Sequence, residues 1–279
     1  MSPAAPDVLS AFRRSEQAYH AQLTAPQPIA AGMAFCAAAF PHLPDANQIR
    51  DVLLFDATMA DAYAGVEAHF SARQRCCLRW TLSSEQPAEP VERHLAALGW
   101  VRREQAVFGL SHWPSLDELR AAHEAELRIL PARAMRKAHR QSWLDDVEAA
   151  ADADLRAELA DAANERLDDA NLDGFVAVIG GETAGRVGLL EVGDICRVQD
   201  LYVCPASRGR GVATALLRHA LQLAYRLRPR IAIASGWITK TGVSSDRESD
   251  GVGASRRVLQ RFGFVEAGRL TSWERSGVH

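Results

Sequence analysis

The sequence predicts an α/β protein, of the α+β kind, in which a smaller N-terminal domain precedes a larger one. Three observations support this fold class. Apolar residues make up 48% of the 279 residues, enough to build one large or two ordinary cores. Segments typical of strands alternate with segments typical of helices along the whole chain. A break at residues 111–115, which contains Pro114, separates predicted domains at 1–113 and 114–279.

The N-terminal domain is predicted to open with a helix, followed by an extended segment and alternating strands and helices. Pro26 and Pro28 end the opening helix, because proline lacks a backbone donor and restricts the residue before it. Gly99 is typical of the residue that stops a helix. The predicted helices are 11–23, 60–70 and 91–98, and the predicted strands are 51–55, 75–82 and 100–110.

In the C-terminal domain, Ser115 is expected to cap a new helix after Pro114 breaks the preceding element. A strand at 126–130, helices at 132–143 and 146–166, strands at 174–179, 183–192 and 195–203, and a helix at 211–227 follow. These assignments rest on length, periodicity and β-branched content.

The overall charge points to no polyanionic partner. The net charge is −3 and the pI is near 6.3, so neither nucleic acid nor an anionic membrane is favoured. The N-terminus lacks a basic segment followed by an apolar core, and the apolar stretch 29–40 is shorter than the ~20 residues of a membrane helix. We expect a cytoplasmic protein with no membrane or nucleic-acid partner.

No metal site is expected from the sequence. The five cysteines are an odd number without C-x-x-C spacing, which argues against a disulfide framework and a structural zinc site. No H-x-x-x-H or related spacing connects His69, His94, His139 and His219. The cysteines are expected to be buried thiols.

The strongest functional signal lies where the strand 195–203 meets the helix 211–227. Between them stands the pattern Arg208-x-x-Gly211-x-Ala213. Glycines let the backbone approach a ligand closely, and the free N–H groups at the start of a helix favour pyrophosphate oxygens. Arg208 and Arg210 add charge-assisted contacts. The alternative is a surface strand, turn and helix that happens to be basic.

Two other phosphate-binding motifs do not fit this turn. The P-loop pattern G-x-x-x-x-G-K-[ST] is absent. The dinucleotide pattern G-x-G-x-x-G fails because Thr214 stands where the third glycine is needed. The turn therefore favours neither ATP nor a dinucleotide.

These residues resemble the GNAT superfamily of N-acetyltransferases, whose coenzyme A motif R/Q-x-x-G-x-G/A lies between a strand and a helix. The resemblance covers about 116–273, and 253–264 is similar to the superfamily's closing helix and its entry into the next strand. It implies a mixed, mostly antiparallel sheet flanked by helices, with acetyl-CoA as acyl donor. The acetyl-pantetheine arm would bind the backbone of Leu201, Tyr202 and Val203, and the pyrophosphate would bind Arg208, Gly209, Arg210, Gly211, Val212, Ala213 and Thr214.

The N-terminal domain is less specifically similar to the leading domain of bacterial GNAT proteins, which implies a bacterial-type chain. Residues 98–101 and 262–265 repeat the pattern of glycine followed by an aromatic residue, each after a predicted helix. Either the N-terminal domain is a degenerate GNAT-like copy, or this is a common joint between helix and strand. The first 110 residues contain no glycine-rich phosphate loop, so a duplicated copy would have lost its cofactor site.

One departure concerns the general acid. Many superfamily members carry a tyrosine in the closing helix that protonates the leaving thiolate, and Leu259 stands at that position here. Tyr202 or Tyr225 could replace it, although a tyrosine on a strand or helix face more often serves packing. Water, or the thiolate itself, could also complete the reaction, because a thiol with a pKa near 8.5 is a good leaving group.

For the general base, Asp200 is the leading candidate because it lies near the reacting end of its strand. Glu191 and Asp194 flank the same hairpin, and for all three a solvated or turn-forming acid is the simpler interpretation. The stretch 145–169 holds ten acids, which form either a cation-steering surface or a solvated acidic helix. A backbone N–H near 201–203 is the expected oxyanion donor.

We therefore expect an N-acetyltransferase that moves an acetyl group from acetyl-CoA to a primary amine of a small molecule or peptide, as a monomer or homodimer. The acceptor should bind between the domains or against the early helices of the second domain. One alternative is a non-catalytic acyl-CoA-binding regulatory protein, and another is a tandem GNAT enzyme of the mycothiol synthase type. Neither the acceptor nor the acyl length follows from the sequence.

Overall fold

The computed structural model describes residues 3–54, 57–120, 126–146, 152–238 and 250–275. The chain forms two compact units, and each is assembled from separated segments. Unit 1 contains residues 1–18 and 105–269, and unit 2 contains 19–104 and 270–279. The boundaries of these two units differ from the predicted division between residues 113 and 114. The predicted division into two domains stays a prediction.

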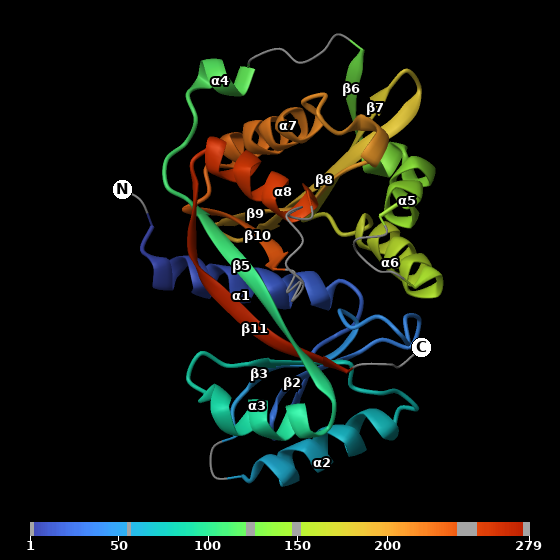
Figure 1. The fold of residues 1–279 in the computed structure, drawn as a ribbon, viewed down its shortest axis with the longest axis vertical. Coiled ribbons are helices and arrows are strands. Elements are labelled where there is room, and N and C mark those ends of the chain that lie inside the picture. Colours follow the sequence, from blue (N-terminus) through green and yellow to red (C-terminus); the bar gives the residue numbers. More distant parts are fainter. Residues whose placement is uncertain (1–2, 55–56, 121–125, 147–151, 239–249, 276–279) are drawn as a thin grey trace. The chain divides into compact units, whose positions relative to one another are not determined.

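Unit 1 holds the larger sheet, with strands in the order β11-β5-β10-β9-β8-β7-β6 (Figure 1). Strands β6 to β9 pair antiparallel, and β9 pairs parallel with β10. The elements are α1 Ala5–Ala21, β5 Trp100–Leu110, α4 Leu116–Arg120, β6 Leu127–Pro131, η1 Ala132–Ala134, α5 Arg136–Leu144, α6 Ala153–Arg166, β7 Leu172–Ile179, β8 Glu182–Val192, β9 Ile195–Val203, η2 Pro205–Ser207, α7 Val212–Leu227, β10 Ile231–Ile238, α8 Asp250–Arg261 and β11 Phe264–Arg275.

The core of unit 1 lies between its sheet and α7, the orange helix of Figure 1. Leu216, Leu217 and Leu221 recur at helical spacing and are fully buried. They pack in one cluster with Val187 of β8 and Val198 of β9. This packing fixes the start of α7 beside the end of β9, because the two elements are joined by a short turn.

Unit 2 is a smaller α/β unit, with strands in the order β1-β2-β3-β4-β11. Its elements are β1 Gln27–Ile29, β2 Gly32–Cys36, β3 Asn47–Val52, α2 Met59–Ser71, β4 Arg79–Leu82 and α3 Ala88–Ala97. Strand β3 pairs parallel with β4, and the other described pairs are antiparallel. Trp80 and Trp273 face each other across β4 and β11 in its core.

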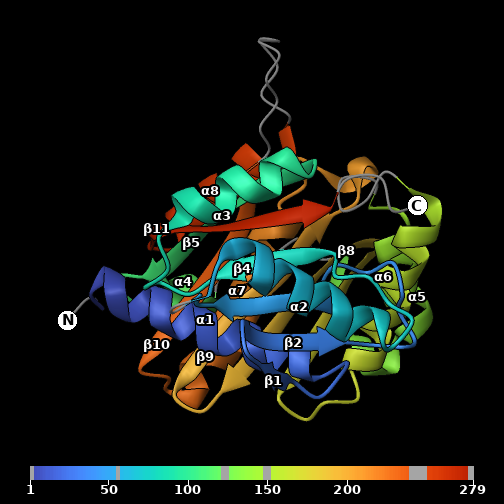
Figure 2. The ribbon, with the colours of Figure 1, turned by 90° about the horizontal axis from the view of Figure 1, so that it is seen from below.

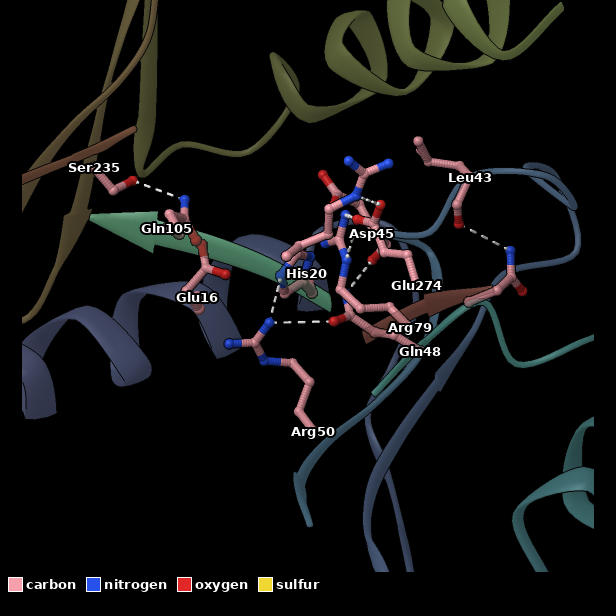
Figure 3. Close-up of polar contacts among 12 residues, drawn as sticks. Glu16, His20, Leu43, Asp45, Gln48, Arg50, Arg79, Gln105, Ser235 and Glu274 are labelled. Carbon is pink, nitrogen blue, oxygen red and sulfur yellow. Dashed lines mark hydrogen bonds and ion pairs between the residues drawn. The ribbon is translucent and has the colours of Figure 1, made fainter. Parts of the chain in front are cut away.

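A buried polar network crosses the sheet of unit 2 (Figure 3). Arg79 forms ion pairs with Asp45 at 2.5 Å and with Glu274 at 2.7 Å. Arg50 donates to His20 and to the Gln48 side chain, both at 3.2 Å. Buried arginines of this kind need such partners, because an unpaired charge away from water is costly.

Several predicted elements are confirmed. Residues 100–110 and 195–203 form strands with the predicted bounds, and Ser115 caps α4 by accepting a hydrogen bond from the Glu118 N–H. The repeated joint is also present, since Gly99 and Gly263 adopt φ values of 80° and 85° between a helix and a strand. Both glycines occupy backbone conformations that residues with a Cβ rarely adopt.

Other predicted bounds were wrong. The first helix begins at Ala5 rather than residue 11, because the proline-rich start is followed by a helical apolar face with Val8 buried. The strand predicted at 51–55 lies at 47–52, and the one predicted at 75–82 is shorter and spans Arg79–Leu82. The helix predicted at 146–166 begins at Ala153, where the Asp152 side chain accepts from Leu155 N–H, while 147–151 lie outside the described residues.

Helix α1 belongs to unit 1 as far as residue 18, although it comes first in the chain. Glu16 forms a 2.5 Å ion pair with Arg197 of β9, and both side chains are more than nine-tenths buried. The Arg197 guanidinium also lies over the Phe12 ring, 4.8 Å from its centroid. At Gly109 of β5, an added Cβ would come within 2.7 Å of Val8, so the glycine permits close packing of α1.

Helices α5 and α6 pack side by side at the far end of unit 1 (Figure 2). Buried His139 contacts the Asn164 Oδ1 at 2.8 Å through its Nδ1, and the Trp143 indole N–H donates to its Nε2 at 3.3 Å. Both ring nitrogens are therefore satisfied by the neutral tautomer that carries its proton on Nδ1. Burial is the main cause that lowers the pKa of His139 to about 4.

We expect Glu16→Ala to lower the free energy of unfolding by about 3–5 kcal/mol, because it leaves Arg197 buried without its carboxylate. Urea unfolding followed by circular dichroism measures this loss. The matched control is Arg14→Ala, whose pair with Asp194 is about half exposed and should contribute less than about 1 kcal/mol. Equal, small effects of the two substitutions would contradict a supporting role for the buried pair.

The stability of the wild-type protein should decrease by about 3 kcal/mol through His139 as pH falls from 6.5 to 4. In this window the unfolded chain binds a proton that the folded histidine does not, so acid favours unfolding. His139→Gln should flatten the pH dependence of the unfolding free energy between these values. A His139→Gln curve that runs parallel to the wild-type curve would refute this origin.

Candidate functional site

Strands β9 and β10 part at the point where the candidate residues lie. They pair from Ile195 and Ile231 to Val198 and Ala234, and within the described part of the chain no later positions are paired. Both strands nevertheless continue, β9 to Val203 and β10 to Ile238. The backbone N–H and C=O groups on this edge of β9 are therefore not used by β10.

A β-bulge accompanies the parting of the strands. Arg186 of β8 pairs with Tyr202 and Gly188 pairs with Gln199, so Asp200 and Leu201 together stand opposite one residue. Asp200 has a φ of 56°, a left-handed conformation that is uncommon for a residue with a side chain. Such a bulge re-aims the side chains that follow and breaks the regular ladder.

The turn after β9 is the one that the sequence indicates. The short helix η2 follows Val203, and Gly209 and Gly211 then adopt φ values of 79° and 75°. A Cβ added at either glycine would meet no described atom within 4 Å, so open space lies beside both. Gly211 is the N-cap of α7, and no side chain caps this end of the helix.

The two arginines of the turn are exposed, as are both glycines. Arg208 Nε donates to the Val203 carbonyl over 3.4 Å, which holds the arginine close to the end of β9. Val212 is buried in the core beneath, whereas Ala213 and Thr214 are half-buried. The turn thus combines positive charge, open backbone and the positive end of a 16-residue helix.

Tyr202 faces away from α7. Its hydroxyl donates to the Asp145 carbonyl at 3.0 Å, and its ring lies under the Arg186 guanidinium at 4.5 Å. Burial is the main cause that raises the pKa of Tyr202 to about 12, with the carboxylate of Asp146 adding to it. The catalytic role of Tyr202 stays a prediction, and this geometry favours a role in packing.

Sequence reasoning missed the cluster around Arg186. This buried side chain forms a 2.6 Å ion pair with Asp146 and donates to the Ser142 carbonyl at 2.6 Å. Its guanidinium also lies 3.7 Å from the Trp143 ring centroid. An arginine in the middle of an otherwise apolar strand was the available signal, because such a charge is buried only with a partner.

The other acid–base candidates lie apart from the bulge or are engaged elsewhere. Leu259 is 5% exposed and packs in the core of unit 1. Tyr225 is exposed and packs edge-on against Trp113 at 5.5 Å. Asp194 lies in the turn of the hairpin, where a hydrogen bond from Arg230 lowers its pKa.

Part of the acidic stretch 145–169 is paired with basic residues of a neighbouring helix. Asp161 pairs with Arg140 of α5 at 2.6 Å, and Asp168 pairs with Arg136 of the same helix. Asp152 caps α6. Two acids of this stretch therefore belong to ion pairs with α5.

No group of three or more His, Cys, Asp or Glu side chains in the described residues could hold a metal ion. No described helix has the length and apolar character needed to cross a membrane.

A model of the Acetyltransferase (GNAT) family matches residues 132–234, which span η1 to β10. The match includes the parted end of β9, the glycine turn and α7. No curated protein matches the sequence significantly.

Three solved structures resemble the fold over most of the chain. A functionally unknown conserved protein from Staphylococcus epidermidis has a TM-score of 0.62 at 10% identity, over 90% of this chain and 93% of its own. A GCN5-related N-acetyltransferase from Kribbella flavida has a TM-score of 0.59 at 12% identity, over 96% of both chains. A GCN5-related N-acetyltransferase-like protein from Streptococcus suis has a TM-score of 0.50 at 10% identity, over 82% of this chain and 77% of its own.

At these identities the solved structures establish the fold, a mixed and mostly antiparallel sheet flanked by helices. The family model also covers the segment that holds the parted end of β9 and the glycine turn. Residues 132–234 therefore match the acetyltransferase (GNAT) family, and this match supports an acyltransferase enzyme.

Proposed function

We propose that this protein transfers an acetyl group from acetyl-CoA to a primary amine of a small molecule or peptide, by direct attack in a ternary complex. The observation that carries the proposal is the adjacency of two features on one short segment. The end of β9 has backbone groups that β10 does not use, and five residues of turn connect it to Gly209 and the uncapped start of α7. A thioester and a pyrophosphate need these two environments at neighbouring positions.

The glycine turn fits the pyrophosphate of the acyl donor. Gly209 and Gly211 leave open space where a side chain would stand, so phosphate oxygens can approach the backbone N–H groups. The start of α7 contributes the positive end of its dipole, and exposed Arg208 and Arg210 contribute charge. Backbone groups of 201–203 are proposed to hold the pantetheine arm as an added strand would.

The residues around the bulge have defined tasks in this mechanism. A backbone N–H of the parted β9 segment donates to the carbonyl oxygen of the thioester as negative charge develops there. The acceptor nitrogen forms the new C–N bond, the C–S bond breaks, and coenzyme A leaves as its thiolate. Asp200 takes the proton released from the nitrogen, directly or through a water.

A non-catalytic acyl-CoA-binding protein is the second candidate, because the family position that often provides the general acid is occupied by Leu259, buried in the core. A thiol is a good leaving group without such an acid. Release of free coenzyme A in the presence of primary amines distinguishes an enzyme from a binding protein.

The proposed donor site can be tested by binding. Calorimetric titration should show micromolar binding of acetyl-CoA to the wild-type protein. The double substitution Arg208→Glu and Gly211→Glu should weaken binding by at least about 100-fold, because it replaces attraction by repulsion and places a side chain where the backbone has a φ of 75°.

Arg226→Glu is the matched control for this experiment. It makes the same charge change as Arg208→Glu alone, at an exposed position in the last turn of the same helix, away from the glycine turn. Binding to this variant should remain within about threefold of the wild type. If wild-type protein does not bind acetyl-CoA, or if both variants lose binding equally, the proposed donor site is wrong.

The role of Asp200 as proton acceptor can be tested by its rate effect. Asp200→Asn should lower kcat for a primary amine by about 10²–10⁴-fold while the Kd for acetyl-CoA stays unchanged, because the substitution removes a base and not a phosphate contact. Coenzyme A release measured with a thiol reagent gives the rate. Asp194→Asn, on the same hairpin but paired with Arg230, should keep the wild-type rate. Wild-type kcat in Asp200→Asn would exclude this residue as the base.

A further inference from the structure

A row of polar side chains lies on the sheet face of unit 1 that α7 does not cover. On β5, β9 and β10, the residues that pack against α7 include Ala106, Val198 and Ala234. Because side chains alternate along a strand, the neighbouring residues Gln105, Gln199 and Ser235 are expected to point to the opposite face. Gln105 Nε2 donates to Ser235 Oγ at 3.0 Å (Figure 3).

Gln199 occupies a special position in this row. It is the first residue of β9 beyond the part paired with β10, and it directly precedes the bulge residue Asp200. Its side chain is buried, with the residue only 4% exposed. Its Nε2 donates to the Asp200 carboxylate at 3.2 Å.

The amide orientation of Gln199 follows from this contact. A carboxylate only accepts hydrogen bonds, so the nitrogen must face Asp200 and the oxygen must face elsewhere. Among the described residues, the Gln199 Oε1 is buried and has no hydrogen-bond partner. A buried acceptor without a partner costs about 1–3 kcal/mol, and such groups are rare in folded proteins.

The surrounding backbone accommodates this amide. Gly188 of β8 pairs with Gln199, and a Cβ added there would lie 3.1 Å from the Gln199 Cγ and 3.6 Å from its Nε2. Any larger residue at 188 would press on the amide. The glycine thus leaves the space that the Gln199 side chain occupies.

We infer that Gln199 binds the attacking nitrogen of the acceptor through its Oε1, beside the parted end of β9. This inference rests on the proposed function and adds a substrate-binding residue to it. The acceptor nitrogen donates one N–H to Gln199 Oε1 and directs its lone pair at the thioester carbon. The C–N bond forms, the C–S bond breaks, and Asp200 receives the proton that the nitrogen loses.

The contact also selects the class of acceptor. An uncharged primary amine has two N–H groups, so one can remain bonded to Gln199 while the lone pair attacks. A thiol is a weak hydrogen-bond donor and has only one hydrogen. Gln199 therefore favours a nitrogen nucleophile that enters in its neutral form over a thiol.

The experiment uses hydroxylamine as a small amine that is largely uncharged at neutral pH, with acetyl-CoA as donor. Acetohydroxamate is measured as its iron(III) complex, after subtraction of the rate without protein. Gln199→Met keeps the length of the side chain and removes the amide. We expect it to raise KM for hydroxylamine at least tenfold, and to leave the Kd for acetyl-CoA unchanged.

Thermal unfolding provides a readout that does not depend on the acceptor. Gln199→Met should leave Tm close to the wild-type value, because removing a buried oxygen that has no partner offsets the loss of the hydrogen bond to Asp200. Gln105→Met is the matched control: it is equally buried, but its amide is bonded to Ser235, so Tm should fall while KM for hydroxylamine stays unchanged.

A fall in Tm of Gln199→Met like that of Gln105→Met, with an unchanged KM, would make Gln199 a structural residue and overturn the inference. Failure of the wild-type protein to bind acetyl-CoA is a separate result, since it removes the proposed function on which the inference rests. The combination of unchanged Tm, unchanged Kd and raised KM supports both.

Discussion

The parting of β9 from β10 after Val198 is the constraint on which the candidate site depends. A continuous ladder would use the backbone groups of 199–203 and leave none for a ligand. The bulge at Asp200 lies in the same stretch, and the core beneath α7 holds β9 and β10 together up to that point. The same packing places the glycine turn directly after the open segment, so the two features form one surface.

This construction explains which parts of the molecule the sequence could predict. The strand at 195–203 and the helix that follows were predictable, because their periodicity, turn glycines and basic residues are local signals. The bulge and the parting of the strands arise from pairing between distant segments, which no local pattern records. The buried ion pair of Arg186 depends on Asp146, 40 residues away in the sequence, and was missed for the same reason.

The division into two units could not be predicted from the sequence, for a related physical reason. A sequence is read in order, whereas unit 1 takes its first helix from one end of the chain and its sheet from the other. Glu16 shows no signal of its own, since an acid on a helix is usually solvated. Only the buried partner Arg197, supplied by β9, shows that this acid belongs to the sheet that carries the candidate site.

The discontinuous units also affect how the protein is made. During synthesis α1 leaves the ribosome well before Arg197, the partner of its Glu16, is added. Unit 2 similarly waits for β11, the last described strand, to bring Trp273 beside Trp80. Neither unit can be completed before β11 has been synthesised, so the apolar face of α1 lacks its native partners during synthesis of the residues between them.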